Sequence, residues 1–246
     1  MASLRSRFKL CTFDVTNTLL KFKLPVGEQY AKVGRIYGVD REPAQITSAF
    51  LHHWKEMNAK FPNFGCSQGL SSKEWWGNLV KKTFSIEGEK ISHKQLDCIS
   101  NHLYDIYKNN VCWELVPGAL TLLKLLREKG ITVGVISNFD ERLESVLCSY
   151  DLYPYFNFVL ASFIVQVAKP ERKIFDLALN YVPCIQSLDA LHIGDDYKLD
   201  YEAAKNAGWN ALLVCDKTRK ETLPKDINHE EVVENISEIE SHIFCL

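Results

Sequence analysis

Short apolar runs alternate with amphipathic segments over most of the chain, and this alternation predicts strands and helices of a parallel α/β sheet. The expected strands are residues 10–13, 131–136, 156–160, 188–193 and 211–214. The expected helices carry apolar side chains at helical spacing and cover residues 118–129, 140–149, 170–181 and 199–207, with a last helix at 230–243 on the sheet edge.

The alternation stops between residues 24 and 111, where only helical patterns remain. The expected helices cover residues 26–37, 42–58, 75–84 and 91–107. Ser71 and Glu74 have the spacing of a capping box, which predicts a helix start just before Trp75. We therefore expect an α/β domain made of residues 1–21 and 113–246, with a helical domain inserted at residues 22–112.

The composition excludes few functions. Of the 246 residues 46% are hydrophobic, and the net charge is −2 with no basic tract, so no nucleic-acid partner is expected. No apolar run reaches the length of about 18 residues that a membrane span needs, so no membrane association is expected. Residues 1–9 are basic, but the first strand begins too early to leave a long targeting segment. We expect an intracellular protein, favour the cytoplasm over the mitochondrion or nucleus, and expect a monomer or weak homodimer.

The cysteines and the neighbouring histidines carry no recognisable metal motif. The eight cysteines lack paired spacing, which indicates small buried hydrophobic residues rather than disulfides or zinc ligands. His52 and His53 are adjacent, so we expect them to point to different sides of a helix and to be poor joint ligands.

Polar residues follow the predicted strands at four places along the chain. Because ligands gather at the carboxyl ends of parallel strands, we expect these side chains to share one crevice. They are Asp14 after the first strand, Ser137 and Asn138 after the second, Lys169 before Pro170, and Asp195, Asp196 and Asp200 after Gly194.

The acidic residues of this set indicate a site for a hard cation. Asp195, Asp196 and Asp200, with Asp14 nearby, would repel one another unless a cation bridged them, and oxygen ligands suit Mg²⁺. Asp196 or Asp200 could instead cap the helix that follows. Asp14 could be a nucleophile toward phosphorus, or an acid that caps the turn after its strand.

These four segments, in this order, resemble the motifs of the haloacid dehalogenase superfamily of hydrolases, whose members are mostly phosphatases that use a nucleophilic aspartate and magnesium. The resemblance implies a Rossmann-like parallel-sheet core, with the helical insertion as a cap that closes over a small phosphorylated metabolite.

The resemblance also implies a role for each residue of the motifs. Asp14 would be the nucleophile and would form an aspartyl-phosphate. Asp14, Asp195 and the backbone carbonyl of Thr16 would bind Mg²⁺ directly. Asp196 would bind through water or orient other ligands, and Asp200 would lie behind the ligands without binding the ion itself. The transferring phosphoryl group would be bound by Ser137 and the Asn138 N–H, and Lys169 would offset its charge. Thr18 would hydrogen-bond within the turn or to Asp14.

Thr16 departs from the family pattern, because phosphatases of the family usually carry a second aspartate there that protonates the leaving group and activates water. Threonine does not titrate near neutral pH, so that help, about 10²–10⁴-fold in rate, should be missing. We expect a Mg²⁺-dependent phosphatase of weak or selective activity. The alternative is a catalytically silent protein that binds phosphorylated metabolites or acts as a scaffold. A metal-independent dehalogenase is less favoured, because such relatives typically carry tyrosine at the position of Thr16.

Overall fold

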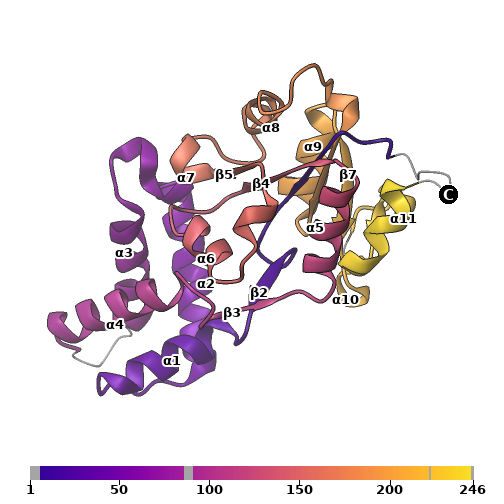
Figure 1. Ribbon diagram of the computed structural model, residues 1–246. Coiled ribbons are helices and arrows are strands. Elements are labelled where there is room, and N and C mark those ends of the chain that lie inside the picture. Colours follow the sequence, from indigo (N-terminus) through magenta and orange to yellow (C-terminus); the bar gives the residue numbers. More distant parts are fainter. Residues whose placement is uncertain (1–5, 86–90, 222, 245–246) are drawn as a thin grey trace. The chain divides into compact units, whose positions relative to one another are not determined.

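A computed structural model describes residues 6–85, 91–221 and 223–244, and it divides the chain into two compact units (Figure 1). Unit 1 comprises residues 1–21, 115–138 and 150–246, and unit 2 comprises residues 22–114 and 139–149. The unit boundaries at 21/22 and 114/115 lie near the expected ones at 21/22 and 112/113. Residues 139–149 follow the Ser137–Asn138 segment directly but are counted with the helical unit. Residues 1–5 and Cys245 lie outside the described part of the chain.

Unit 1 contains a six-stranded parallel sheet with the strand order β5-β4-β1-β6-β7-β8, which confirms the predicted α/β class. Its strands are β1 (Leu10–Phe13), β4 (Thr132–Ser137), β5 (Phe158–Ala161), β6 (Ala190–Gly194), β7 (Asn210–Val214) and β8 (Val232–Val233). β1 is central, between β4 and β6, and its four residues are completely buried.

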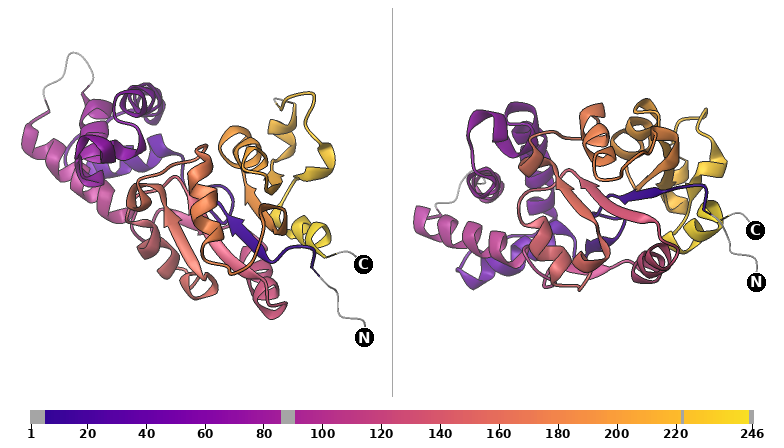
Figure 2. Two further views of the ribbon diagram at one scale, coloured as in Figure 1. Left: turned by 90° about the horizontal axis from the view of Figure 1, so that it is seen from above. Right: turned by 45° about the horizontal axis from the view of Figure 1, so that its top comes forward.

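Helices cover both faces of the sheet (Figure 2). The helices of unit 1 are α5 (Ala119–Glu128), α7 (Ser162–Val165), α8 (Arg172–Leu179), α9 (Ala203–Asn206), α10 (Lys217–Lys220) and α11 (Ile239–Ile243). Buried side chains of α8 and α9 form one apolar cluster with Leu10, Ile136 and Leu213 of the sheet. α5 and α11 lie on the opposite side of the sheet from α8 and α9.

Unit 2 is helical and has its own apolar core. It contains α1 (Val26–Ile36), α2 (Pro43–Lys60), α3 (Ser72–Phe84), α4 (His93–Ile106), α6 (Leu143–Cys148) and a 3₁₀ segment at Asn63–Gln68. Tyr30, Ile46, Phe84 and Ile99 are among the buried residues of the core. The predicted capping box of Ser71 and Glu74 is confirmed, since each side chain accepts a hydrogen bond from the backbone N–H of the other.

Two short strands were not predicted. β2 (Leu20–Phe22) and β3 (Trp113–Leu115) pair as a two-stranded sheet, and both unit boundaries pass through it. Strands of three residues are too short to show the alternation that reveals longer ones.

The predicted last helix at 230–243 is wrong. The segment begins with a 3₁₀ turn at His229–Glu231, continues as β8, and ends as a second 3₁₀ turn at Ile236–Glu238 followed by α11. The β-branched pair Val232 and Val233 favours extended backbone, and here it adds an edge strand to β7. The Asn235 side chain then accepts a hydrogen bond from Ser237 N and starts a new turn.

Two other expectations about side chains need correction. Cys148 and Cys184 are exposed rather than buried, and Cys66 and Cys98 are half-buried. The rings of His52 and His53 lie 4.9 Å apart at their centroids, so these side chains do not diverge.

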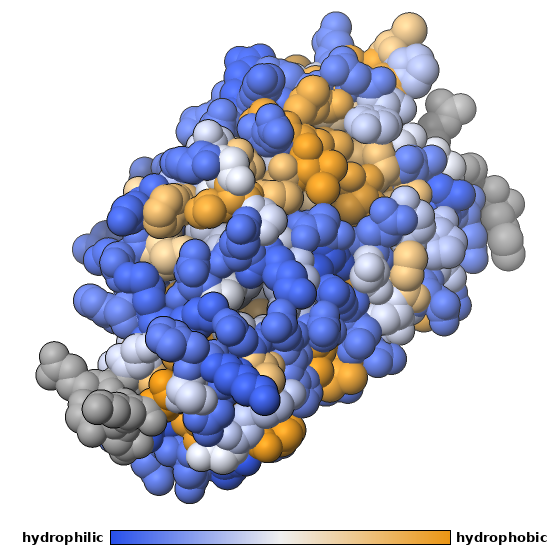
Figure 3. All heavy atoms as spheres, turned by 90° about the vertical axis from the view of Figure 1, so that its left-hand side faces the viewer, coloured by the Kyte–Doolittle hydropathy of each residue, from blue (hydrophilic) through white to orange (hydrophobic). Residues whose placement is uncertain are grey.

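Among the described helices none combines the length and the apolarity that crossing a membrane requires. The face shown in Figure 3 is mostly hydrophilic, with hydrophobic side chains in separate patches.

Candidate active site at the carboxyl edge of the sheet

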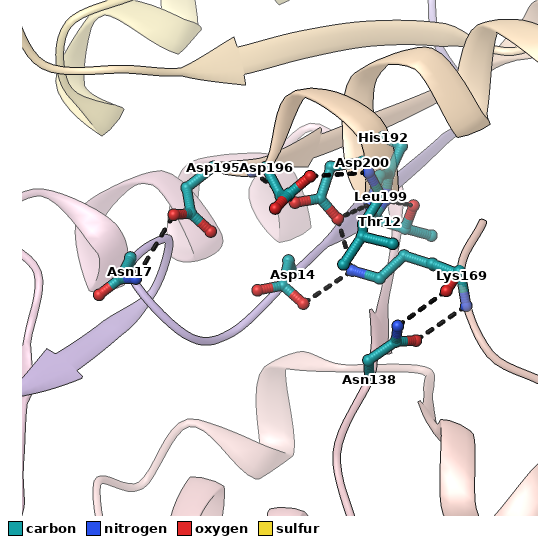
Figure 4. A network of polar contacts seen from close by, with 10 residues as sticks. All are labelled: Thr12, Asp14, Asn17, Asn138, Lys169, His192, Asp195, Asp196, Leu199 and Asp200. Atoms are coloured by element: carbon teal, nitrogen blue, oxygen red, sulfur yellow. Dashed lines mark hydrogen bonds and ion pairs between the residues drawn. The ribbon is translucent and has the colours of Figure 1, made fainter. Parts of the chain in front are cut away.

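The candidate site lies in unit 1, where β1, β4 and β6 end (Figure 4). Asp14 follows β1, Ser137 ends β4, and Gly194 ends β6 just before Asp195. Asp14 N donates to Ile193 O at 2.9 Å, so the chain after β1 stays next to β6 as it leaves the sheet. The sheet therefore holds Asp14 and Asp195 close together by main-chain pairing alone.

Lys169 is the cation of the site and lies between two carboxylates. Its Nζ is 2.8 Å from Asp14 Oδ1 and 2.5 Å from Asp200 Oδ1. All three side chains are buried, with Lys169 only 4% exposed. Burial opposes the charged amine, but the two carboxylates outweigh it and raise the pKa of Lys169 above its usual range.

Asn138 fixes the backbone that carries this lysine. Its Nδ2 donates to Lys169 O at 2.9 Å, and Lys169 N donates to its Oδ1 at 2.8 Å. This two-bond clamp joins the end of β4 to the loop before α8. The side chain of Asn138 thus positions Lys169, whereas sequence reasoning considered only its N–H. The neighbouring Ser137 is buried, and its side chain opposes the rise in the pKa of Asp14.

Three carboxylates form a compact cluster. Asp14, Asp195 and Asp200 each present an oxygen within 4.8 Å of the others. Burial is the main cause that raises the pKa of Asp14, and the charge of Asp200 adds to it while Lys169 opposes it. Burial, followed by the charge of Asp14, raises the pKa of Asp195 to about 6. The cluster therefore holds more negative charge than its neighbours compensate.

Asp196 and Asp200 have different surroundings. Asp196 Oδ1 accepts from Lys198 N and Leu199 N, so its carboxylate caps the π-type turn at Tyr197–Glu202 that leads into α9. Asp200 Oδ2 accepts from Asp196 N at 2.9 Å. The Asp200 carboxyl group lies against Gly194. A Cβ atom added to Gly194 would lie 2.2 Å from the carboxyl carbon of Asp200. Glycine is thus required at position 194 for Asp200 to enter the cluster.

Arg219 of α10 binds Asp195 at two atoms. Its Nη1 is 3.0 Å from Asp195 Oδ2, and its Nη2 donates to Asp195 O at 3.0 Å. The Arg219 side chain is 48% exposed, so this charge is partly solvated. No sequence pattern indicated this contact, because Arg219 lies 24 residues from Asp195 in a basic helix of four residues.

The turn after Asp14 presents Thr16 and buries Thr18. Asn17 adopts a φ of 58°, a left-handed conformation that asparagine tolerates better than most residues. Thr16 is partly exposed. Thr18 is fully buried, and within the described structure its hydroxyl has no hydrogen-bond partner, whereas its backbone N–H donates to Val15 O at 3.3 Å within the turn.

Sequence reasoning missed Thr12 and His192. Both are completely buried in β1 and β6, and Thr12 Oγ1 lies 2.8 Å from His192 Nδ1. His192 Nε2 lies 3.1 Å from Asp200 Oδ1. The available signal was a lone histidine in an otherwise apolar strand that leads directly into the acidic cluster.

A second group of possible metal ligands lies on α2 in unit 2. His52, His53 and Glu56 each offer a ligand atom within 4.8 Å of the others. However, Lys82 Nζ already binds both carboxylate oxygens of Glu56, at 2.8 and 3.0 Å. This exposed group therefore has its anionic ligand occupied by a cation.

The geometry and the sequence together assign the family. Residues 8–208 match the haloacid dehalogenase-like hydrolase family, and the chain belongs to that family. It is 35% identical over 249 residues to the rhythmically expressed gene 2 protein of Drosophila melanogaster, covering 97% of this chain and 96% of that relative. It is also 35% identical over 227 residues to haloacid dehalogenase-like hydrolase domain-containing protein 3 of Mus musculus, covering 90% of each.

Solved structures with this fold include both dehalogenases and phosphatases. A 2-haloacid dehalogenase from Pseudomonas syringae pv. Tomato DC3000 aligns with a TM-score of 0.65 at 17% identity, covering 95% of this chain and 97% of its own. A HAD phosphatase from Thermococcus onnurineus aligns with a TM-score of 0.62 at 20% identity, covering 96% and 97%. The fold is common to phosphatases and dehalogenases, so the residues of the site must distinguish between these activities.

Proposed function

We propose that this hydrolase is a Mg²⁺-dependent phosphatase that acts slowly or selectively on a small phosphorylated metabolite through an aspartyl-phosphate on Asp14. The observation that carries the proposal is the buried carboxylate cluster of Asp14, Asp195 and Asp200 with Lys169 bound to it. The helical unit would be the cap, and the protein would act as a monomer or weak homodimer.

The donor set of the cluster fits Mg²⁺. Mg²⁺ prefers oxygen ligands and is usually held by one or two carboxylates together with water and substrate phosphate. Burial is the first cause of the raised pKa values of Asp14 and Asp195, and the charges of neighbouring carboxylates add to it, so a bound cation would favour their ionised forms. Asp14 and Asp195, with the Thr16 carbonyl, would hold the ion. When bound, it would neutralise charge on the phosphoryl oxygens and orient them.

The residues of the chain would divide the reaction between them. A carboxylate oxygen of Asp14 attacks phosphorus, the Asp14–phosphorus bond forms, and the bond to the ester oxygen breaks. Lys169 and Ser137 stabilise the charge on the phosphoryl oxygens. The leaving oxygen takes its proton from water, because Thr16 cannot supply one. Water then attacks phosphorus, which releases phosphate and restores the Asp14 carboxylate.

Thr16 also favours a second candidate function. Without an acid–base group the chain could bind a phosphorylated metabolite at the same residues and not turn it over, or act as a scaffold. A metal-independent dehalogenase is less well supported, because the excess negative charge of the cluster favours a cation.

The test is to supply the missing group. We expect Thr16→Asp to raise Mg²⁺-dependent release of phosphate from small phosphate monoesters by about 10²-fold or more. Thr16→Asn is the matched control, because asparagine has nearly the same shape as aspartate and cannot transfer a proton. Asp14→Asn in the Thr16→Asp background should abolish the gain. If neither the parent protein nor Thr16→Asp hydrolyses any ester while Mg²⁺ still binds, the phosphatase proposal fails and the binding role replaces it.

A further inference from the structure

A chain of buried hydrogen bonds runs from the interior of the sheet to Asp14. It connects Thr12, His192, Asp200, Lys169 and Asp14 in that order, and Figure 4 shows the side chains in sequence. The largest exposure among them is the 7% of Asp14. All five residues belong to unit 1.

The strand register explains why the first two meet. Thr12 and His192 are direct partners in the parallel pairing of β1 with β6. Because side chains alternate along a strand, Leu10, Thr12 and Asp14 share one face of β1. Leu10 and its partner Ala190 belong to the apolar cluster under α8 and α9. Thr12 and His192 therefore form a polar layer between that apolar core and the acidic site.

The partners of His192 determine where its ring proton lies. Asp200 Oδ1 accepts a hydrogen bond from the Lys169 ammonium group at 2.5 Å and lies 3.1 Å from His192 Nε2, so this carboxylate is paired as an anion. An ionised carboxylate only accepts hydrogen bonds, so His192 Nε2 must carry a proton. Burial lowers the pKa of His192, and the resulting neutral ring leaves Nδ1 as an acceptor for the Thr12 hydroxyl.

With this arrangement Asp200 is fully engaged. Its Oδ1 accepts from Lys169 Nζ and His192 Nε2, and its Oδ2 accepts from Asp196 N. Three donors from three different segments fix both the rotamer and the charge of this carboxylate. Asp200 is thereby a fixed anchor for the Lys169 amine rather than a free ligand for a cation.

We infer that His192 is a positioning residue: as the neutral Nε2–H tautomer, locked by Thr12, it holds Asp200 so that Lys169 is kept at the nucleophile Asp14. The catalytic meaning of this role rests on the proposed function, but the arrangement of protons and contacts does not. An ordinary core histidine would contribute packing, such as its edge contact with the Phe175 ring at 5.4 Å between centroids, without controlling Lys169.

The experiment uses NMR on the full-length protein and needs no turnover. Long-range ¹H–¹⁵N spectra should show His192 protonated at Nε2 and unprotonated at Nδ1. The Lys169 ammonium group should give a signal protected from exchange with water. His192→Leu should keep the fold and the packing but speed that exchange by about 10-fold or more, because Asp200 loses a charge-assisted hydrogen bond. His192→Gln, which retains a side-chain N–H, should restore much of the protection.

Each outcome is decisive for the positioning role. An Nδ1–H tautomer or a charged imidazolium in the parent protein would overturn it, even if His192→Leu does not fold. Unchanged Lys169 exchange in a folded His192→Leu would reduce His192 to a packing residue. Thr12→Val keeps the shape of the threonine but removes the donor to His192 Nδ1, so it should mix the two ring tautomers and speed Lys169 exchange, though by less than His192→Leu does. Absence of phosphatase activity in Thr16→Asp would sink the proposed function and leave these results standing.

Discussion

Two clusters of buried charged side chains, one in each unit, differ in how their charges balance. In unit 2 the Arg142 guanidinium binds Asp140 with two parallel hydrogen bonds, at 2.8 Å from Nε and 2.6 Å from Nη2. Trp76 Nε1 donates to the same carboxylate at 2.7 Å. The rings of Trp76 and Tyr104 lie near the guanidinium, at 5.0 and 4.2 Å from their centroids. One cation meets one anion, and because the Arg142 backbone N–H also donates to Oδ1, each carboxylate oxygen has two donors.

The cluster in unit 1 has the opposite balance. Asp14, Asp195 and Asp200 lie together, and their cations are the buried Lys169 and the half-exposed Arg219. The Arg142–Asp140 pair is neutral and fully hydrogen-bonded, so it has no affinity for a further ion. The cluster in unit 1 has excess negative charge and therefore favours binding of a cation. Burial of charge alone therefore does not mark a candidate cation site, whereas uncompensated negative charge does.

Breaking the balanced pair should produce the largest loss of stability. We expect Arg142→Met to lower the free energy of unfolding by about 3–5 kcal/mol, because Asp140 would be left as a buried, uncompensated charge. Arg172→Met is the matched control, since Arg172 and Asp176 form an exposed pair at 3.5 Å that should contribute about 0.5 kcal/mol or less. Denaturant unfolding measures both. A loss below about 1 kcal/mol for Arg142→Met would show that the pair is not the closed structural element described above.

The sequence predicted the meeting of Asp14, Lys169 and Asp195, because the carboxyl ends of neighbouring parallel strands share one edge of the sheet. Their order along the chain was enough to place them. The division between Asp196 and Asp200 could not be predicted, because it depends on the π-type turn that follows β6. Arg219 could not be placed either, since its reach depends on the path of an irregular segment.

The contacts of His192 show a different limit. Its strand could be predicted, but its partner Thr12 follows from the register between β1 and β6, and these strands are 180 residues apart in sequence. Likewise, nothing in the sequence pattern separated Asp140 and Arg142 from ordinary helix-start residues. Their burial depends on Trp76, which lies 64 residues before Asp140.

Removing one anion from the unbalanced cluster should abolish its response to metal. We expect Mg²⁺ at 100 times its dissociation constant to raise the stability of the parent protein by about 2.7 kcal/mol. Asp195→Asn should remove most of that increment, because the amide is neutral and a weaker ligand. The exposed Asp176→Asn makes the same chemical change outside the cluster and should leave the increment intact. Thermal unfolding with and without Mg²⁺ gives the comparison, and an unaltered increment in Asp195→Asn would place the ion elsewhere.

Lowering the pH should weaken the binding of Mg²⁺ without affecting the Arg142–Asp140 pair of unit 2. The pKa of Asp195 is raised from its ordinary value to about 6. In the metal-free protein this group favours the folded state at low pH, and that contribution is lost as the pH rises through about 6. Mg²⁺ binds the ionised form of Asp195, so the stabilisation by Mg²⁺ has the opposite pH dependence and increases as the pH rises over the same range.

Below pH 6 the apparent affinity for Mg²⁺ should fall about tenfold per pH unit, which is about 1.4 kcal/mol of binding free energy. Calorimetric titration with Mg²⁺ at about pH 7, 6 and 5 measures this change in affinity. A flat profile would mean that Asp195 is already ionised at pH 5 and that Arg219 compensates the cluster more fully than its half-exposed position indicates.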